Sequence, residues 1–146
     1  MIEFLRVDPA SAEALSLQAS LSAALSAITG DSGQSSFEPD GDGIVFFVAR
    51  QHGRAVACGC IRRLDDEVAE IKRMYAEPGT VGVGFQLLRH LEAIARAGGY
   101  RQLCLSTRRV NARAVAFYER NGYAEIAAYG RYAGREQSIC LGKILR

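Results

Sequence analysis

The sequence contains no tryptophan, only three prolines and only two histidines in 146 residues, so several kinds of active site have few candidates. His52 stands in a predicted hairpin turn and His90 on a predicted helix, and we expect both to be surface residues. A relay that pairs serine or cysteine with histidine is therefore disfavoured. If the chain is an enzyme, its chemistry has to come from other side chains or from the backbone.

Cysteine is also scarce, with four residues and no C-x-x-C pair. In a chain without a secretory signal, this usage is typical of reduced thiols. Cys58 and Cys60 lie two residues apart in a predicted strand, where both would face the same side. Since no second ligand pair and no histidine is nearby, we expect them to pack in the sheet rather than bind zinc, and we predict no metal site.

Long apolar runs and an excess of charge of one sign are absent too. No segment approaches the length that crosses a bilayer, and the first residues lack the basic start and apolar centre of a signal peptide. A net charge of +2, with 23% charged residues, offers no strong field to nucleic acid. We therefore expect a cytoplasmic protein that binds neither membrane nor nucleic acid, folded as one domain over residues 1–146.

The hydrophobic spacing predicts alternating strands and helices. Three strand-like runs in residues 43–77 are joined by short turns, which indicates three successive antiparallel strands. A helix over 84–98 then leads to a strand at 101–106, and such a crossover makes this strand parallel to the one before the helix. The expected order is strand 1–7, one or two helices in 10–29, strands 43–50, 54–63 and 68–77, helix 84–98, strand 101–106, a short helix capped by Asn111, and strands 123–128 and 137–144.

The stretch GTVGVGFQLL, residues 79–88, places three glycines before a predicted helix. A glycine turn between a strand and a helix exposes backbone N–H groups at the positive end of the helix dipole, which suits phosphate or pyrophosphate. The stretch is not the dinucleotide fingerprint, because the third glycine of G-x-G-x-x-G would fall at Leu87. Nor is it a P-loop, because no Gly-Lys-Ser/Thr follows.

Gly82-Val83-Gly84 resembles the last three places of the R/Q-x-x-G-x-G/A loop that holds the pyrophosphate of acetyl-CoA in the GCN5-related N-acetyltransferase (GNAT) superfamily. Further along, NARAVAFYERNGY resembles the N-x-x-A-x-x-x-Y-x-x-x-G-[FY] segment of the same superfamily. The strand AEIKRMYA resembles its fourth strand, and the predicted order of elements agrees. One place departs from the pattern, because Gly79 stands where the loop usually has Arg or Gln.

The resemblance implies an α/β (α+β) GNAT fold. Its central sheet would be mixed and mostly antiparallel, with six to seven strands flanked by helices and a splay between the fourth and fifth strands. The implied activity is an N-acetyltransferase that uses acetyl-CoA as cosubstrate and transfers the acetyl group directly to a primary amine of a small molecule or peptide. The sequence does not indicate which amine, and it leaves a homodimer open.

By the same resemblance, Tyr118 would hydrogen-bond or protonate the departing CoA sulfur. Glu70 corresponds in position to a glutamate that acts as general base through water. Each has a structural alternative: Tyr118 would pack under the sheet with its hydroxyl satisfied. Glu70 would be a solvated strand residue paired with Lys72 or Arg62. The residues implied to bind acetyl-CoA are Met74, Tyr75, Ala76, Gly79, Val81, Gly82, Val83, Gly84, Phe85, Asn111, Ala114 and Phe117.

Basic residues gather near the predicted strand ends, where they would serve either an acidic group or an ordinary solvated surface. They are Arg62, Arg63, Lys72, Arg73, Arg108 and Arg109. Arg89 or Arg109 is also a candidate to replace the charge missing at Gly79. The polar loop 30–43 and the segment 129–132 would line an acceptor pocket, or would be plain surface loops.

Two other functions compete with this reading. A non-catalytic acyl-CoA-binding sensor or interaction module would explain the glycine at position 79. An RNA- or chromatin-binding domain fits poorly, because a net charge of +2 and unclustered aromatic residues provide neither a basic surface nor a stacking platform.

Overall fold

The computed structural model describes residues 1–33 and 43–146. One seven-stranded sheet runs through them in the order β1-β2-β3-β4-β5-β7-β6. The strands are β1 (Ile2–Arg6), β2 (Val45–Gln51), β3 (Arg54–Arg63), β4 (Val68–Ala76), β5 (Gln102–Arg108), β6 (Ala124–Ile126) and β7 (Ser138–Ile144). The helices are α1 (Ala12–Thr29), α2 (Val83–Ala97) and α3 (Ala112–Arg120), with a 3₁₀ turn η2 (Gly130–Tyr132). The predicted order of elements is confirmed, and segment 10–29 holds a single α-helix.

Local signals explain where the helices begin and end. The Ser11 hydroxyl caps α1 by accepting from the Ala14 N–H, and α1 ends at Gly30 in the left-handed conformation. The Asn111 side chain caps α3 in the same way, as predicted, by accepting from the Ala114 N–H at 3.3 Å. After α2 the chain turns at Gly99, whose φ of +86° requires glycine.

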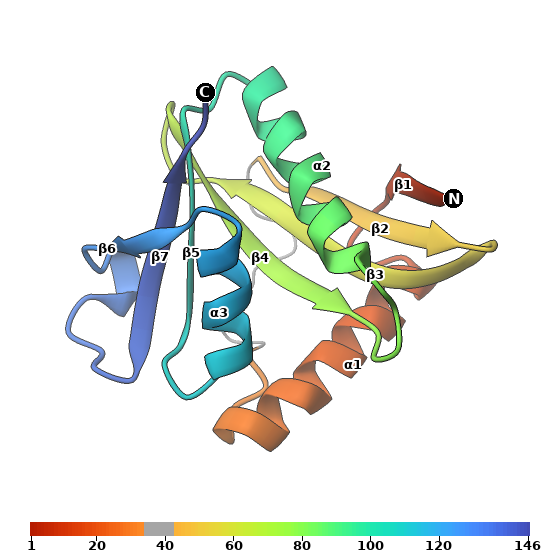
Figure 1. Ribbon diagram of the computed structural model, residues 1–146, viewed down its shortest axis with the longest axis horizontal. Helices are drawn as coiled ribbons and strands as arrows, with labels where there is room; N and C mark the ends of the chain where they lie inside the picture. The colour runs from red at the N-terminus through yellow and green to blue at the C-terminus, as the bar shows by residue number, and fades with distance from the viewer. Residues whose placement is uncertain (34–42) are drawn as a thin grey trace.

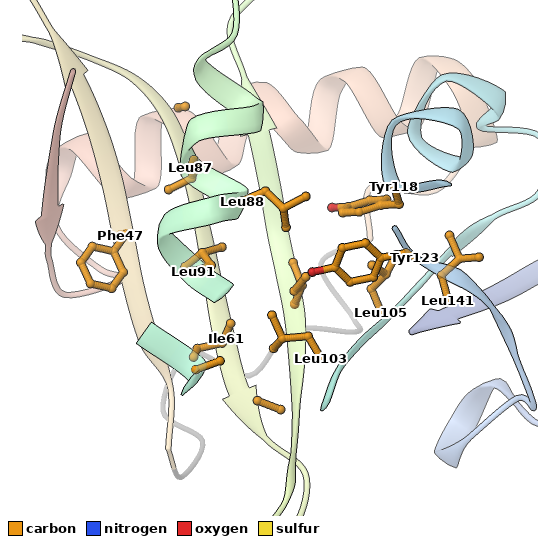
Figure 2. Packing of buried hydrophobic residues seen from close by; sticks show 14 of the residues in the cluster. Phe47, Ile61, Leu87, Leu88, Leu91, Leu103, Leu105, Tyr118, Tyr123 and Leu141 are labelled. Carbon is orange, nitrogen blue, oxygen red and sulfur yellow. The ribbon is translucent and has the colours of Figure 1, made fainter. Parts of the chain in front are cut away.

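The helices cover the two faces of the sheet, with α2 and α3 on one face and α1 on the other (Figure 1). Leu87, Leu88 and Leu91 of α2 are fully buried and belong to one core with Ile61 and Leu103 of the sheet (Figure 2). Their helical spacing is that of an amphipathic helix with one apolar face. This larger core fixes α2 and α3 as a pair over the centre of the sheet.

Cys58 and Cys60 pack beneath α1, in a smaller core that includes Ala14, Leu17 and Phe46. Both side chains are fully buried on the same face of β3, which confirms the predicted packing. Burial raises the pKa of each thiol to about 12, so both cysteines stay in the unreactive thiol form.

The sheet is mixed, mostly antiparallel and splayed between β4 and β5, as predicted. These two strands pair in parallel only from Val68 to Glu70, opposite Gln102 to Cys104. Beyond that point they separate: β4 continues antiparallel to β3, while β5 continues antiparallel to β7. The separation leaves backbone and side chains of both strands available between them.

A bulge in β4 lies on this diverging part of the strand. Cys60 pairs with Lys72 but Cys58 pairs with Tyr75, so β4 has one more residue than β3 in this interval. Arg73 takes up the extra length with a φ of +56°, a conformation that is uncommon for a residue with a Cβ. Its guanidinium is tied to α1 through the carbonyl of Gln18 and the hydroxyl of Ser22, at 3.0 and 2.7 Å.

One expectation about exposure changes with the structure. His90 is half-buried rather than fully exposed, because its ring lies between Phe4 and Phe47, with centroids 4.5 Å from each. Its Nε2 is buried and has no hydrogen-bond partner among the described residues. Most of the predicted loop 30–43, namely residues 34–42, lies outside the described part of the chain. Within that part, no helix combines the length and apolar character needed to span a bilayer.

Candidate active site

A cavity of about 210 Å³ lies where β4 and β5 separate. Residues 71–74 of β4 and 105–108 of β5 form its two sides. Helix α3 contributes Asn111, Ala114 and Tyr118, and α1 contributes Leu21 and Leu25. Segment 131–138, between η2 and β7, forms a further wall. The cavity thus lies where two neighbouring strands leave hydrogen-bonding groups unpaired.

Tyr118 reaches this cavity from α3. Its side chain is 7% exposed and packs edge-on against Phe117 and Tyr123, so its ring has a fixed orientation. Its hydroxyl end points from α3 toward α2 in the view of Figure 2. No hydrogen-bond partner is recorded for this hydroxyl in the described residues. The expected packing of Tyr118 is confirmed, and no protein group among the described residues bonds to its hydroxyl.

Burial raises the pKa of Tyr118 above its usual value. The phenol therefore stays protonated at neutral pH and keeps a proton to donate into the cavity. A buried tyrosine normally places its hydroxyl on a protein partner, so this arrangement is suited to a group supplied from outside the chain.

Glu70 lines the cavity at the last position where β4 pairs with β5, and it is 1% exposed. Its Oε1 faces Arg62 at 3.1 Å and Lys72 at 3.7 Å, and its Oε2 accepts from the Tyr129 hydroxyl at 2.6 Å. The predicted pairing with Lys72 or Arg62 is confirmed, and the predicted solvation is wrong. The reason is tertiary, since the segment that carries Tyr129 folds over this strand.

The glycine turn connects the end of β4 to the start of α2. Gly79 and Gly82 have φ values of +88° and +73°, so both positions need glycine for their backbone. No side chain caps α2, and the N–H groups of its first turn have no partner within the helix. A Cβ on Gly84 would lie 3.7 Å from Ala76 and 3.8 Å from Phe117, so the turn packs closely against β4 and α3.

The backbone conformation at position 79 explains why glycine stands there without any loss of function. Its φ of +88° strains any residue with a Cβ, including the Arg or Gln common at this place of the loop. The two proposed replacements for that charge have other partners. Arg89 bonds to Glu92 at 2.7 Å and stacks on Phe85, and Arg109 bonds to Glu125 of β6 at 3.2 Å.

The predicted site residues fall into two adjoining groups. Glu70, Met74, Asn111, Ala114 and Tyr118 line the cavity. The others lie along the turn or beside it: Tyr75, Ala76, Gly79, Val81, Gly82, Val83, Gly84, Phe85 and Phe117. Among them the side chain of Tyr75 packs against the core beneath α1, so only its backbone faces the splay.

The structure also adds cavity residues that sequence reasoning did not single out. Ser106, Thr107, Arg135 and Ser138 line it, together with Thr29. Ser106 and Thr107 come from the end of β5, Arg135 and Ser138 from the start of β7 and the loop before it, and Thr29 from the end of α1. Pairing between β5 and β7 is a long-range feature without a local sequence signal. For Arg135 the only available signal was its closeness in sequence to the predicted acceptor segment 129–132.

Comparison with known proteins agrees with this geometry. Residues 15–123 match the Acetyltransferase (GNAT) family. This chain belongs to that family. An IAA acetyltransferase from Azospirillum brasilense is 37% identical over 106 residues, which cover 70% of this chain and 69% of that protein.

Solved structures of GNAT proteins share the whole fold. One from Klebsiella pneumoniae subsp. pneumoniae, assigned as an acyl-CoA N-acyltransferase, is 30% identical with a TM-score of 0.86 and covers 100% of this chain and 99% of its own. A GNAT acetyltransferase from Elizabethkingia anophelis with acetyl-CoA bound is 15% identical, with a TM-score of 0.75 over 99% and 98% of the two chains. The latter likeness concerns the fold alone.

Proposed function

We propose that this GNAT protein is an N-acetyltransferase that transfers the acetyl group of acetyl-CoA directly to a primary amine of a small molecule or peptide. The observation that carries the proposal is the Tyr118 side chain, which lines the cavity, has a ring held by packing and a protonated hydroxyl, and has no hydroxyl partner among the described residues. Acetyl transfer from a thioester needs a group of this kind, because the thiolate leaves with negative charge.

The residues present fit acetyl-CoA in two places. The left-handed glycines Gly79 and Gly82 leave the backbone bare beside the uncapped N-terminus of α2, which suits the pyrophosphate. Between β4 and β5, the backbone around Met74 and Ala76 provides hydrogen-bonding groups for the pantetheine amide and the acetyl carbonyl. Asn111 uses its side-chain carbonyl as a helix cap, so a contact with the pantetheine arm would use its remaining polar atoms.

Tyr118 acts as the acid in this proposal. Its raised pKa keeps the proton on the phenol until the carbon–sulfur bond of the thioester breaks, when the thiolate accepts it. The amine nitrogen forms the new bond to the acetyl carbon and releases its proton to water, and Tyr118 takes a proton back from water, so that the acid is restored. Direct transfer in a ternary complex leaves no acetylated side chain, in keeping with cysteine thiols held protonated by burial.

Two roles for Glu70 are compatible with its place on the cavity wall, that of a general base and that of a positioning residue. As general base it would take the proton of the amine through a water molecule, and its place on the cavity wall supports that role. Its contacts favour a positioning role, because both oxygens already bind partners and two of those partners are cations. We therefore propose that Glu70 chiefly fixes Lys72 and Tyr129, and that the amine enters in its neutral form.

The experiment is an assay of thiol release from acetyl-CoA with a panel of amines, with products identified by mass spectrometry. Acetylated amine formed with release of CoA supports the proposal. If acetyl-CoA raises the unfolding temperature but no amine is acetylated, the protein is an acyl-CoA-binding module instead. The departure at Gly79 favours that second function, but the left-handed backbone there explains the glycine without it.

A further inference from the structure

Positive charge dominates the cavity wall. Among the described residues, five cationic side chains line the cavity, namely Lys72, Arg73, Arg108, Arg131 and Arg135, against two carboxylates, Asp31 and Glu70. The described part of the wall therefore carries three more positive than negative charges. The glycine turn that suits the pyrophosphate contributes no residue to this wall, so the excess belongs to the other end of the site.

Both carboxylates are already matched by cations. Asp31 pairs with Arg108 at 3.0 Å, and Glu70 lies 3.7 Å from Lys72. Arg135 differs, because no carboxylate or other acceptor is recorded for its guanidinium among the described residues. An arginine that faces a cavity without a protein anion is arranged to receive an anion from elsewhere.

The backbone that carries Arg135 is held in place. Its N–H donates to the Tyr132 carbonyl, and its own carbonyl accepts from the Ser138 N–H, each at 3.1 Å. The Tyr132 hydroxyl accepts from Lys72 at 3.0 Å, which ties this turn to β4. Arg135 is an exposed residue, but its turn is held by these hydrogen bonds and presents it at the mouth of the cavity.

We propose that the acceptor is an amine that also carries an anionic group, a carboxylate or a phosphate, and that Arg135 binds this group. The inference deepens the proposed N-acetyltransferase function and rests on it. A guanidinium forms two parallel hydrogen bonds with either anion, which also orients the amine relative to the cavity. Amines with several positive charges are disfavoured by the same wall, because like charges repel.

The first experiment compares matched acceptors that differ only in charge. Amino acids are compared with their amides, and phosphoethanolamine with ethanolamine, while spermidine represents polycationic amines. We expect kcat/KM to be about tenfold or more higher for the anionic member of at least one pair, as one charge-assisted contact provides. The first pair reports a carboxylate site and the second a phosphate site. Equal rates within both pairs, or preference for spermidine, overturn the inference.

The second experiment tests Arg135 itself. Arg135→Gln should raise the KM for the anionic acceptor by about tenfold. It should leave the KM for acetyl-CoA and the rate with the neutral partner unchanged. Arg101→Gln is the matched control, since Arg101 is 79% exposed and does not line the cavity. A rise in the KM for acetyl-CoA with no change for the acceptor would instead assign Arg135 to a CoA phosphate and contradict the proposal.

Binding measurements separate this inference from the proposed function. The same amines are titrated into the protein with and without CoA, and heat or chemical-shift changes are recorded. Tighter binding of the anionic partners, lost in Arg135→Gln, supports the anion site even if no amine is acetylated. Equal binding within both pairs overturns the anion site even if acetylation is found.

Discussion

The Tyr129 hydroxyl donates a 2.6 Å hydrogen bond to Oε2 of Glu70. The bond joins a segment near the C-terminus to the last position where β4 pairs with β5, at which the splay begins. Burial, with the nearby Cys104 and Glu70, raises the pKa of Tyr129 above its usual value, so the phenol remains the donor. This contact takes up one of the two carboxylate oxygens and bears directly on the role of Glu70.

We expect Glu70→Gln to lower kcat by about tenfold, because an amide still accepts from Tyr129 but no longer attracts Lys72 and Arg62. The acidic side of the pH profile of kcat should keep its shape, since a positioning residue is not the group that titrates. The measurement is kcat from pH 5.5 to 9 for both proteins. Loss of the acidic limb, with a fall of a hundredfold or more, would assign Glu70 as the base.

Tyr129→Phe tests the same hydrogen bond from the side of its donor. If Glu70 and Tyr129 act together to position the cavity wall, this variant should show a similar loss of kcat. The double variant should then lose little more than either single variant, because neighbouring residues in one network are not additive. Independent, multiplicative losses would contradict a shared positioning role.

Tyr118→Phe removes only the hydroxyl that the proposal assigns as the acid. We expect kcat to fall by about 10²- to 10⁴-fold while the KM for acetyl-CoA stays within a small factor. Stability should change little, because the lost hydroxyl has no recorded partner in the described residues. Tyr100→Phe is the control, since Tyr100 lies at the other end of α2 and does not line the cavity. Equal activity of the two variants would remove Tyr118 from the mechanism.

Local sequence patterns predicted the strands, turn and helices that carry the site residues, but not the distant segments that pack over those residues. The glycine turn and the Asn111 cap could be read from sequence because both depend on neighbouring residues and on φ. The burial of Glu70 and the partial burial of His90 could not, because both arise from segments distant in the chain. Tyr129 covers the first, and Phe4 and Phe47 enclose the second.

The bulge at Arg73 escaped prediction for a related reason. A residue with a Cβ at positive φ has no sequence signal, and here the guanidinium contacts with α1 help to hold it. The partial parallel pairing of β4 and β5 was expected from the crossover helix. That it stops after three residue pairs is a property of the twisted sheet.

His90 should make stability depend on pH in a definite direction. Burial lowers its pKa from 6.5, so below that pH the unfolded chain takes up a proton that the folded chain does not. Stability contributed by neutral His90 is therefore lost as pH falls from about 7.5 toward 5.5. We expect urea unfolding of His90→Phe to show a smaller loss over this range.

His52→Asn is the control for that measurement. His52 lies in the exposed turn between β2 and β3 with a φ of +54°, a conformation that asparagine tolerates. Its variant should keep the pH dependence of the wild-type protein. If His90→Phe and His52→Asn behave alike, the buried imidazole does not control stability in this range.

The lowered pKa of Glu92 leads us to expect a separate loss of folding stability in acid. Burial alone would raise its pKa, but hydrogen bonds from Arg89, Tyr123 and Lys143 hold the pKa below its usual value. Stability from the ionised form is present above about pH 4.5 and is lost as pH falls through the lowered pKa. Glu92→Gln should therefore unfold with less pH dependence between about pH 5 and 3.

The burial of Glu92 also determines how much unfolding free energy is lost when its carboxylate is removed near neutral pH. Glu92 is fully buried, so removal of its charge leaves Lys143 without its anion. We expect Glu92→Ala to cost about 3–5 kcal/mol of unfolding free energy at pH 7. Glu77→Ala, which breaks the exposed pair with Arg54, should cost less than about 1 kcal/mol. Similar costs for the two variants would contradict a buried structural ion network.

The most direct test of the whole account is thermal unfolding with and without saturating acetyl-CoA, for wild type, Gly82→Asp and Gly99→Asp. Both glycines have positive φ and open space around a Cβ, but only Gly82 starts α2. Ligand at 100 times its dissociation constant adds about 2.7 kcal/mol, or roughly 5–10 °C. The account predicts this shift in wild type and Gly99→Asp and its loss in Gly82→Asp, whereas no shift in wild type, or an equal shift in all three, would contradict it.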